Sequence, residues 1–313
     1  MRLITSQSAV VSFALFLLAC NAKPVKKTVK QPEKNDIIAI QGIRYTEVKR
    51  GFSNGLSFDT LGFQQQPSWI IQFQSTDTVL AYDPVKKIMQ PFFLLHDHAA
   101  VYNFAKEYFR FKLLSKDSVV FQRLQVKGKE VVNDIRSDVN MTFYADSYIK
   151  NVLHNDAEKL QRPSRRDTLF IAELVAKANR NPDKPDSVFA GRQVALLTAR
   201  DNRITVERLS QVDRINGRTE AYDYLYPKYK LVIPDAYKDF AYEFTVIVDI
   251  NGKLRLGNFW TNLPEFRKVR KKVLEGITSV YLQNLLKIKP GSTLGMPHAS
   301  EITVAVTGKK SVK

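Results

Sequence analysis

Residues 244–254 read FTVIVDINGKL and place apolar runs on both sides of an Asn251-Gly252 pair. An Asn-Gly pair in this setting is a strong hairpin signal, because a type I′ turn requires positive φ at both central residues. We therefore expect a β-hairpin with a type I′ turn. The hairpin places two strands of a sheet in the C-terminal part of the chain.

A helix is expected after the hairpin, over residues 265–277. Its apolar residues recur at helical spacing and form one face: Phe266, Val269, Val273, Leu274 and Ile277. The rest of the helix surface carries five cations: Arg267, Lys268, Arg270, Lys271 and Lys272. Because like charges this close repel one another unless an anion lies nearby, we predict that these five side chains bind an anionic partner. The alternative is a solvated helix face balanced by Glu265 and Glu275.

The residues beyond this helix predict a turn and a last strand. Lys289-Pro290-Gly291 and Gly295-Met296-Pro297 are typical of a helix end and a strand start. Residues 301–306 follow as a strand at the sheet edge, where unpaired backbone groups can accept a partner's strand. The order of hairpin, helix and strand predicts a three-stranded sheet packed on one or two helices.

Three pieces of this region share motifs with one known domain. In chain order they are Phe189-Ala190-Gly191 with Ala195-Leu196, then Tyr226-Pro227 with the hairpin, then the motifs at 289–291 and 295–297 with the last strand. Together they resemble the C-terminal domain of the energy-transducing protein TonB, in the form common in Bacteroidetes. The resemblance implies that residues 188–313 form a TonB C-terminal-like domain that acts as a periplasmic binding or scaffolding module.

The same region departs from the family's motifs. Ala190 and Arg192 stand where the family has a proline and a second glycine, and the stretch after the first motif exceeds the family's spacing. That stretch holds a further strand candidate, residues 204–209, and a second turn signal, Asn216-Gly217. Both indicate an insertion.

The preceding residues, 37–160, are rich in strand patterns. Apolar and polar residues alternate or run apolar over residues 69–74, 78–82, 108–114 and 118–126. Short strands at this spacing predict an antiparallel sheet or a small barrel, which a helix over residues 145–160 closes. Residues 161–187 are expected to be a linker, because prolines and polar residues surround a short helical candidate, residues 168–178. The predicted fold class is α+β.

The first residues predict secretion and lipidation. Residues 9–18 are an apolar run about half as long as a membrane-spanning helix, which with Arg2 favours a signal peptide over residues 1–19. Leu17-Leu18-Ala19-Cys20 is similar to the bacterial lipobox. The resemblance implies cleavage before Cys20, acylation of its thiol and a membrane anchor.

Cys20 is the only cysteine, which excludes an intrachain disulfide. Asn21 replaces the aspartate that retains lipoproteins in the inner membrane, so the resemblance implies the outer membrane, facing the periplasm. Residues 20–36 hold five lysines and two prolines and are expected to be a disordered tether. A secretory signal with an incidental cysteine is the alternative.

Composition narrows the class of partner. The chain has 44% hydrophobic residues, as folded proteins do, and 48 Lys and Arg against 31 Asp and Glu leave a formal charge of +17. Because a secreted lipoprotein does not meet nucleic acid, the anionic partners that remain are peptidoglycan, an anionic glycolipid or another envelope protein. We expect a non-enzymatic, lipid-anchored envelope binding or scaffolding protein.

Two other functions stay open. Strand alternation over residues 37–160 is similar to that of a lipocalin, which carries an apolar ligand. His96-Asp97-His98, completed by His154 or His298, would suit a metal-dependent hydrolase. We expect no metal and no cofactor, because short turns also use such residues. We also expect no hydrolase or nucleotide-binding motif of the G-x-S-x-G, Walker or G-x-G-x-x-G type. His154 and His298 are expected to be surface or capping residues.

Overall fold

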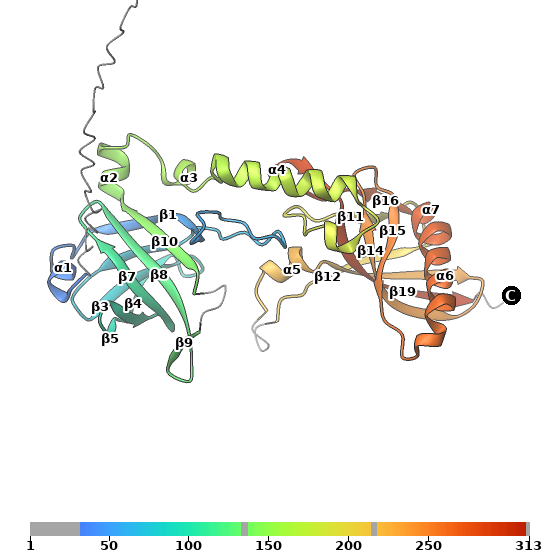
Figure 1. The fold of residues 1–313 in the computed structure, drawn as a ribbon, viewed down its shortest axis with the longest axis horizontal. Helices are drawn as coiled ribbons and strands as arrows, with labels where there is room; N and C mark the ends of the chain where they lie inside the picture. Colours follow the sequence, from blue (N-terminus) through green and yellow to red (C-terminus); the bar gives the residue numbers. More distant parts are fainter. Residues whose placement is uncertain (1–31, 133–136, 214–217, 311–313) are drawn as a thin grey trace, which may run out of the picture. The chain divides into compact units, whose positions relative to one another are not determined.

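In the computed structural model, the first half of the chain forms a ten-stranded sheet, as its alternation of apolar and polar residues predicts (Figure 1). The structure describes residues 32–132, 137–213 and 218–310. The strands are β1 (Arg44–Phe52), β2 (Ile70–Phe73), β3 (Thr78–Asp83), β4 (Ile88–Phe93), β5 (Leu95–His98), β6 (Val101–Phe104), β7 (Glu107–Leu114), β8 (Ser118–Lys127), β9 (Glu130–Val132) and β10 (Val139–Ala145). The four strands predicted from alternation correspond to β2, β3, β7 and β8 and are confirmed.

The sheet is antiparallel and nearly closed on itself. Its strand order is β4-β3-β2-β1-β10-β8-β7-β6-β5, and β9 pairs with β8. β4 and β5 lie at opposite ends of this order, yet only Leu94 separates them in the chain. The two edge strands of the sheet are therefore joined by a single residue of the chain. The expected β-rich antiparallel fold is confirmed.

Aromatic side chains fill the interior of this sheet. Alternate residues of β10 are buried, as expected of a strand with one face turned inward. Phe111 of β7 stacks on Phe121 of β8 with ring centroids 4.5 Å apart, and on Tyr102 of β6 at 4.3 Å. Phe73 of β2 meets Phe111 edge-on at 6.0 Å. The core of the first half is built from rings in mutual contact.

The helix expected over residues 145–160 is wrong as a single element. Two short helices form instead, α2 (Asp146–Asn151) and α3 (Ala157–Leu160). His154, between them, has a φ of 46°, which an α-helix of L-residues does not tolerate. The polar residues around His154 therefore make a turn where apolar spacing alone predicts a helix.

The structured region begins earlier than the expected tether allows. Helix α1 (Lys34–Ile38) starts within residues 20–36, and Ile37 is buried in the core of the first sheet. The expected tether is thus wrong for its last residues. The predicted signal peptide and Cys20 lie outside the described residues.

The stretch expected to be a linker, residues 161–187, contains the 16-residue helix α4 (Arg165–Arg180) and a 3-10 turn, η1 (Pro185–Ser187). Ser164 and Asp167 form a capping box at the start of α4. Ile171 and Ala178 of this helix are buried in one cluster with Phe58, from the loop after β1. The stretch is therefore largely an ordered helix.

The second half of the chain forms a mixed sheet with the order β12-β13-β19-β14-β15. β13 and β19 are parallel, and the other neighbours are antiparallel. The elements are β11 (Leu196–Ala199), β12 (Thr205–Leu209), α5 (Ala221–Leu225), β13 (Lys228–Ala236), β14 (Phe240–Val248), β15 (Leu254–Phe259), η2 (Pro264–Phe266), α6 (Arg267–Gly276), η3 (Ile277–Leu282), α7 (Gln283–Leu285), β16 (Leu286–Lys289), β17 (Ser292–Thr293), β18 (Met296–Pro297) and β19 (Ser300–Lys310).

The expected three-stranded sheet is wrong in both size and order. β12 confirms the strand candidate at residues 204–209, and β13 forms from alternating residues that were not predicted as a strand. β19 lies between β13 and β14, so residues 301–306 are central. Because both of its sides are already paired, this strand has no free edge for a partner's strand; the edges of the sheet are β12 and β15.

The predicted hairpin joins β14 to β15, but its turn is not type I′. Among the turn residues only Gly252 has a positive φ, of 74°. The Asp249 N–H donates to the Lys253 carbonyl at 3.0 Å, and the Asp249 Oδ1 accepts from the N–H groups of Asn251 and Lys253. These bonds close a three-residue loop, in which one left-handed residue suffices. The other turn signal, Asn216-Gly217, lies outside the described residues.

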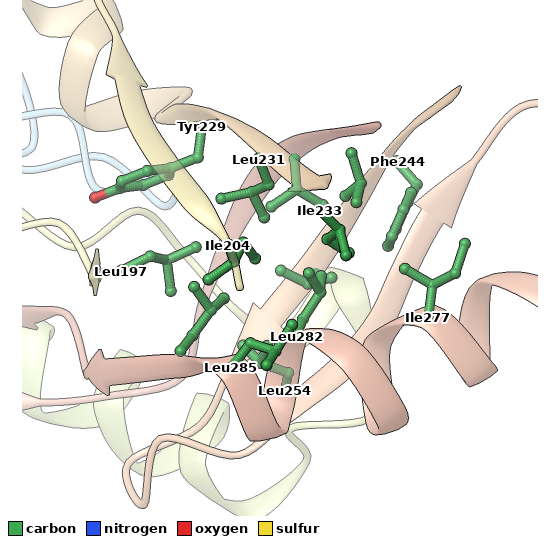
Figure 2. Close-up of a cluster of buried hydrophobic side chains, with 14 of the residues drawn as sticks. Leu197, Ile204, Tyr229, Leu231, Ile233, Phe244, Leu254, Ile277, Leu282 and Leu285 are labelled. Atoms are coloured by element: carbon green, nitrogen blue, oxygen red, sulfur yellow. The ribbon is translucent and has the colours of Figure 1, made fainter. Parts of the chain in front are cut away.

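Helices cover both faces of the second sheet. On one face, Ile277 and Leu282 of the helical segment α6–η3–α7 point toward Leu231 of β13 and Phe244 of β14 (Figure 2). On the other face, Ile247 of β14 is buried in the cluster that contains α4. Residues 31–313 form one compact unit.

Asp167 connects α4 to the loop after β1. Its Oδ1 accepts from the Ser57 N–H at 2.6 Å, and its Oδ2 accepts from the Ser164 N–H at 2.8 Å. Burial by itself raises the pKa of this carboxyl, but the hydrogen bonds from Ser164 and Ser57 outweigh it and hold the pKa of Asp167 below its ordinary value. The ionised form therefore stabilises the fold.

We expect Asp167→Asn to lower the free energy of unfolding by about 1–3 kcal/mol at neutral pH, because it leaves buried donors with a weaker acceptor. The pKa of Asp167 is lower in the folded chain than in the unfolded chain, so this stabilisation is fully present above the ordinary pKa of aspartate. It disappears as the pH falls through the folded pKa. Urea unfolding at several pH values measures both effects. Glu173→Gln, an exposed change on the same helix, should stay within about 0.5 kcal/mol of wild type.

Candidate functional site

Helix α6 carries the five cations predicted to bind a partner. Leu274 of α6 is buried against the sheet, as is Ile277 at the start of η3. Phe266 and Val269, expected on the same apolar face, are 54% and 62% exposed. That part of the prediction is wrong, because Phe266 lies in the 3-10 turn η2 before the helix and Val269 lies at the margin of the stripe that meets the sheet.

Two of the five cations lie over aromatic rings of the sheet. The Arg270 guanidinium is 4.6 Å from the centroid of Tyr242 on β14, and the Arg267 guanidinium is 4.8 Å from that of Phe259 on β15. A ring orients a guanidinium through its quadrupole and leaves the positive charge in place. Both arginines are therefore positioned without being neutralised.

The three lysines are exposed. Lys271 lies 3.7 Å from Glu275, and an exposed pair of this kind contributes about 0.3–0.5 kcal/mol. Lys268 and Lys272 have no carboxylate within 4.0 Å among the described residues. Two cations of the helix thus point into solvent unpaired, and a third is only loosely paired.

An exposed apolar group lies beside these cations. Trp260, Leu263, Phe266 and Val269 are 78%, 48%, 54% and 62% exposed. Leu263 precedes η2 in extended backbone, Phe266 ends η2, and Val269 lies in the first turn of α6. We name these four residues the Trp260 surface.

The Trp260 surface borders a hollow of about 550 Å³. Trp260, Leu263 and Phe266 line it together with Tyr242 of β14 and Arg270 of α6, whereas Val269 does not. Trp260 and Leu263 were missed in the sequence because neither lies in a periodic stretch. The signal that was available is a tryptophan, one of only two in the chain, within a polar loop.

A larger hollow, of about 1440 Å³, is lined in part by four arginines: Arg50, Arg123, Arg192 and Arg208. Arg50 and Arg123 each form a two-pronged pair with a glutamate. Arg192 donates to two glutamine oxygens, and Arg208 donates to a backbone carbonyl. Lys289 lines the hollow as well, but so do three carboxylates, Asp59, Glu220 and Asp223, so the hollow offers less unpaired positive charge than α6.

Arg192 stands where the TonB motif has a glycine, and its guanidinium lies 4.4 Å from the ring centroid of Tyr224. It donates to Gln64 at 3.2 Å and to Gln66 at 2.8 Å. This departure from the motif therefore makes contacts inside the chain that a glycine would not make.

Residues 51–55, GFSNG, match the G-x-S-x-G pattern of hydrolase nucleophiles, so the expectation that the chain lacks this pattern is wrong. Such a serine lies on a sharp turn from strand to helix. Here the Phe52 N–H donates to the Leu56 carbonyl at 2.8 Å, so Ser53 is exposed on a tight reversal after β1. No helix follows Ser53 in this loop, so the strand-to-helix turn that exposes a hydrolase nucleophile is not formed at this position.

His96 and His98 lie on β5 and are exposed. A register shift between them places His96 opposite Tyr102 and His98 opposite Val101, so they do not share a face as in a regular strand. His98 Nδ1 lies 2.7 Å from Asp97, and His96 Nε2 lies 2.8 Å from the Ala99 carbonyl. Within the described part of the chain, no three His, Cys, Asp or Glu side chains form a group that could hold a metal.

His298 is fully buried, so its expected surface or capping position is wrong. Its ring stacks on Phe189 with centroids 3.8 Å apart. Nδ1 lies 3.0 Å from the Ala299 carbonyl, to which it can only donate, which leaves Nε2 to accept from the Thr293 hydroxyl at 3.0 Å. The first and third TonB-like motifs meet at this histidine, where they support the fold.

No family model matches the chain, and no curated protein matches its sequence. We therefore infer the function from the geometry of the site. None of the helices in the described ranges is long and apolar enough to cross a membrane. The strongest candidate site is α6 with the Trp260 surface.

Burial lowers the pKa of His298 below its ordinary value. Below about pH 6.5, the ordinary pKa of histidine, the unfolded chain binds a proton at this residue and the folded chain does not. Stability therefore falls as the pH decreases toward the folded pKa. We expect unfolding free energies to fall by up to about 1.4 kcal/mol per pH unit from this group. His298→Gln should remove that part of the slope, whereas the exposed control His154→Asn should keep it.

Proposed function

We propose that this chain is a non-enzymatic binding or scaffolding protein of the bacterial envelope, held at the outer membrane through Cys20 and facing the periplasm. The observation that carries the proposal is the unpaired charge of α6, where Lys268 and Lys272 extend into solvent beside an exposed apolar surface. An anionic partner relieves the repulsion among the five cations. Peptidoglycan, an anionic glycolipid and an acidic envelope protein all have this chemistry.

The lipid anchor rests on the lipobox-like residues 17–20 behind an apolar run of signal-peptide length. Several acyl chains bind a bilayer far more strongly than one chain does. A protein held in this way meets envelope polymers and lipid headgroups at high local concentration.

We further propose that residues 188–313 are a TonB C-terminal-like module. The motif residues and the order of hairpin, helix and final strand support it. The five-stranded sheet with β19 at its centre differs from the expected arrangement. We therefore propose that the partner binds at the surface of α6. Residues 301–306 cannot accept a partner's strand, because β19 is paired on both sides.

Neither alternative function gains a supporting observation. A lipocalin-like carrier needs an interior that a ligand can enter, and the first sheet is filled by rings such as Phe111 and Phe121 in mutual contact. A metal-dependent hydrolase needs a third ligand near His96 and His98. Within the described ranges, neither His154 nor His298 forms a metal-binding group with them.

Replacing Lys268, Lys271 and Lys272 by Gln should weaken binding to isolated peptidoglycan or to anionic vesicles by about a hundredfold, at about 1 kcal/mol per cation near an anionic surface. Wild-type binding should fall steeply between 0.1 M and 1 M salt, where the Debye length shrinks from about 10 Å to about 3 Å. Co-sedimentation measures both.

The matched control replaces three exposed lysines of the first sheet, Lys86, Lys116 and Lys127, by Gln. It removes the same charge elsewhere and should bind nearly as wild type does. If the α6 variant binds as tightly as wild type at low salt, the face is merely solvated and the proposal is wrong.

Metabolic labelling with a palmitate analogue tests the anchor separately. We expect the label on the wild-type chain and none on Cys20→Ala, because the thiol is the acylated group. Equal labelling of both chains would remove the lipid anchor from the proposal and leave the binding surface untouched.

A further inference from the structure

We propose that the Trp260 surface inserts into the face of an anionic lipid bilayer while the cations of α6 contact the headgroups. This inference rests on the proposed function and names the partner of the same site. It commits to one occupant, a membrane surface rich in anionic lipid.

The apolar part of the surface suits insertion. Trp260, at 78% exposure, lies in the loop after β15. Leu263 just before η2, Phe266 in η2 and Val269 in the first turn of α6 follow it closely in the chain and are also exposed. Large exposed apolar groups gathered in one place mark interaction sites on soluble proteins. Tryptophan in particular has an apolar body and a polar N–H and favours the boundary between headgroups and acyl chains.

The charged part of the surface suits anionic headgroups. Between residues 260 and 272 the chain has five cations and one carboxylate, Glu265, so this segment carries +4. The nearby carboxylates are already engaged, since Glu243 pairs with Lys228 at 2.8 Å and Glu275 lies 3.7 Å from Lys271. Basic residues beside tryptophan, phenylalanine and leucine are the composition of segments that lie in a membrane interface.

The aromatic contacts of the arginines fit the same picture. Arg267 and Arg270 are held over Phe259 and Tyr242, so their guanidinium groups keep their charge at the rim of the apolar residues. Arg270 also lines the hollow beside Trp260 and Phe266. A guanidinium fixed beside an apolar surface can bond phosphate oxygens while its neighbours are buried.

A membrane explains more of this surface than the other anionic partners do. Peptidoglycan is hydrated and would match the cations but leave four exposed apolar side chains in water. An anionic bilayer matches both halves of the surface. An acyl group on Cys20, with only 13 residues between it and the start of α1, would also keep the protein beside such a bilayer.

The test uses the two tryptophans of the chain. In the full-length chain carrying Cys20→Ala, which removes the lipid, Trp69→Phe leaves Trp260 as the only tryptophan. We expect phosphatidylglycerol vesicles at 0.1 M salt to shift its emission to shorter wavelength, and brominated acyl chains to quench it. Phosphatidylcholine vesicles, or 1 M salt, should do neither.

Vesicle co-sedimentation in the same Cys20→Ala background, with both tryptophans present, gives an independent measure. Trp260→Ala should lower binding to phosphatidylglycerol vesicles about tenfold or more, since it removes a large apolar group that insertion would bury. Phe93→Ala, which removes an aromatic ring 80% exposed on β4, is the matched control and should change nothing. Circular dichroism checks that each variant is folded.

The outcomes separate this inference from the proposed function. If phosphatidylglycerol vesicles bind the chain but Trp260 emission does not shift and Trp260→Ala binds normally, insertion is overturned and anionic binding stands. Binding to peptidoglycan with none to vesicles likewise overturns the membrane partner alone. If the chain binds no anionic probe at low salt, both proposals fail.

Discussion

The pairing of β19 on both sides is the constraint on which the second half of the chain depends. β19 is parallel to β13 and antiparallel to β14, so the last strand of the described residues lies between two strands that precede it in the chain. Its alternate residues, including Ile302 and Val304, are buried. Because this pairing satisfies the strand's backbone groups, strand addition to the five-stranded sheet is left to its edges, β12 and β15, and helices cover both of its faces.

That constraint also sets which side of α6 is available. The helix must cover the apolar face of the sheet, which requires Leu274 and Ile277 to point inward. With about 100° between successive residues, the cations at positions 268, 271 and 272 must then point away. The loop that carries Trp260 connects β15 to this helix, so the exposed ring and the exposed lysines come from one short segment. Their proximity is a consequence of packing on the other side of the helix.

The parts of the fold that could be predicted are those in which each residue's burial follows from its own type. Strands such as β8 and β7 were predictable because alternation directly records which face is inward. The position of β19 was not, since a central strand and an edge strand alternate alike when one face is buried. The turn at Asn251-Gly252 was misassigned because the Asp249 carboxylate supplies hydrogen bonds that a dipeptide rule omits. For the site, the cations were visible in the sequence, but the exposure of Phe266 and Val269 depended on how α6 rotates against the sheet.

The way in which α6 tolerates its charges bears on its role. Five cations within six residues destabilise a helix unless something offsets their repulsion. Carboxylates would offset it by neutralising the surface, and only Lys271 has one nearby among the described residues. Aromatic rings under Arg267 and Arg270 offset it differently, because a quadrupole attracts the cation without cancelling its charge at a distance. A helix stabilised in this manner keeps its positive charge exposed to solvent, which is the property that the proposed anion binding requires.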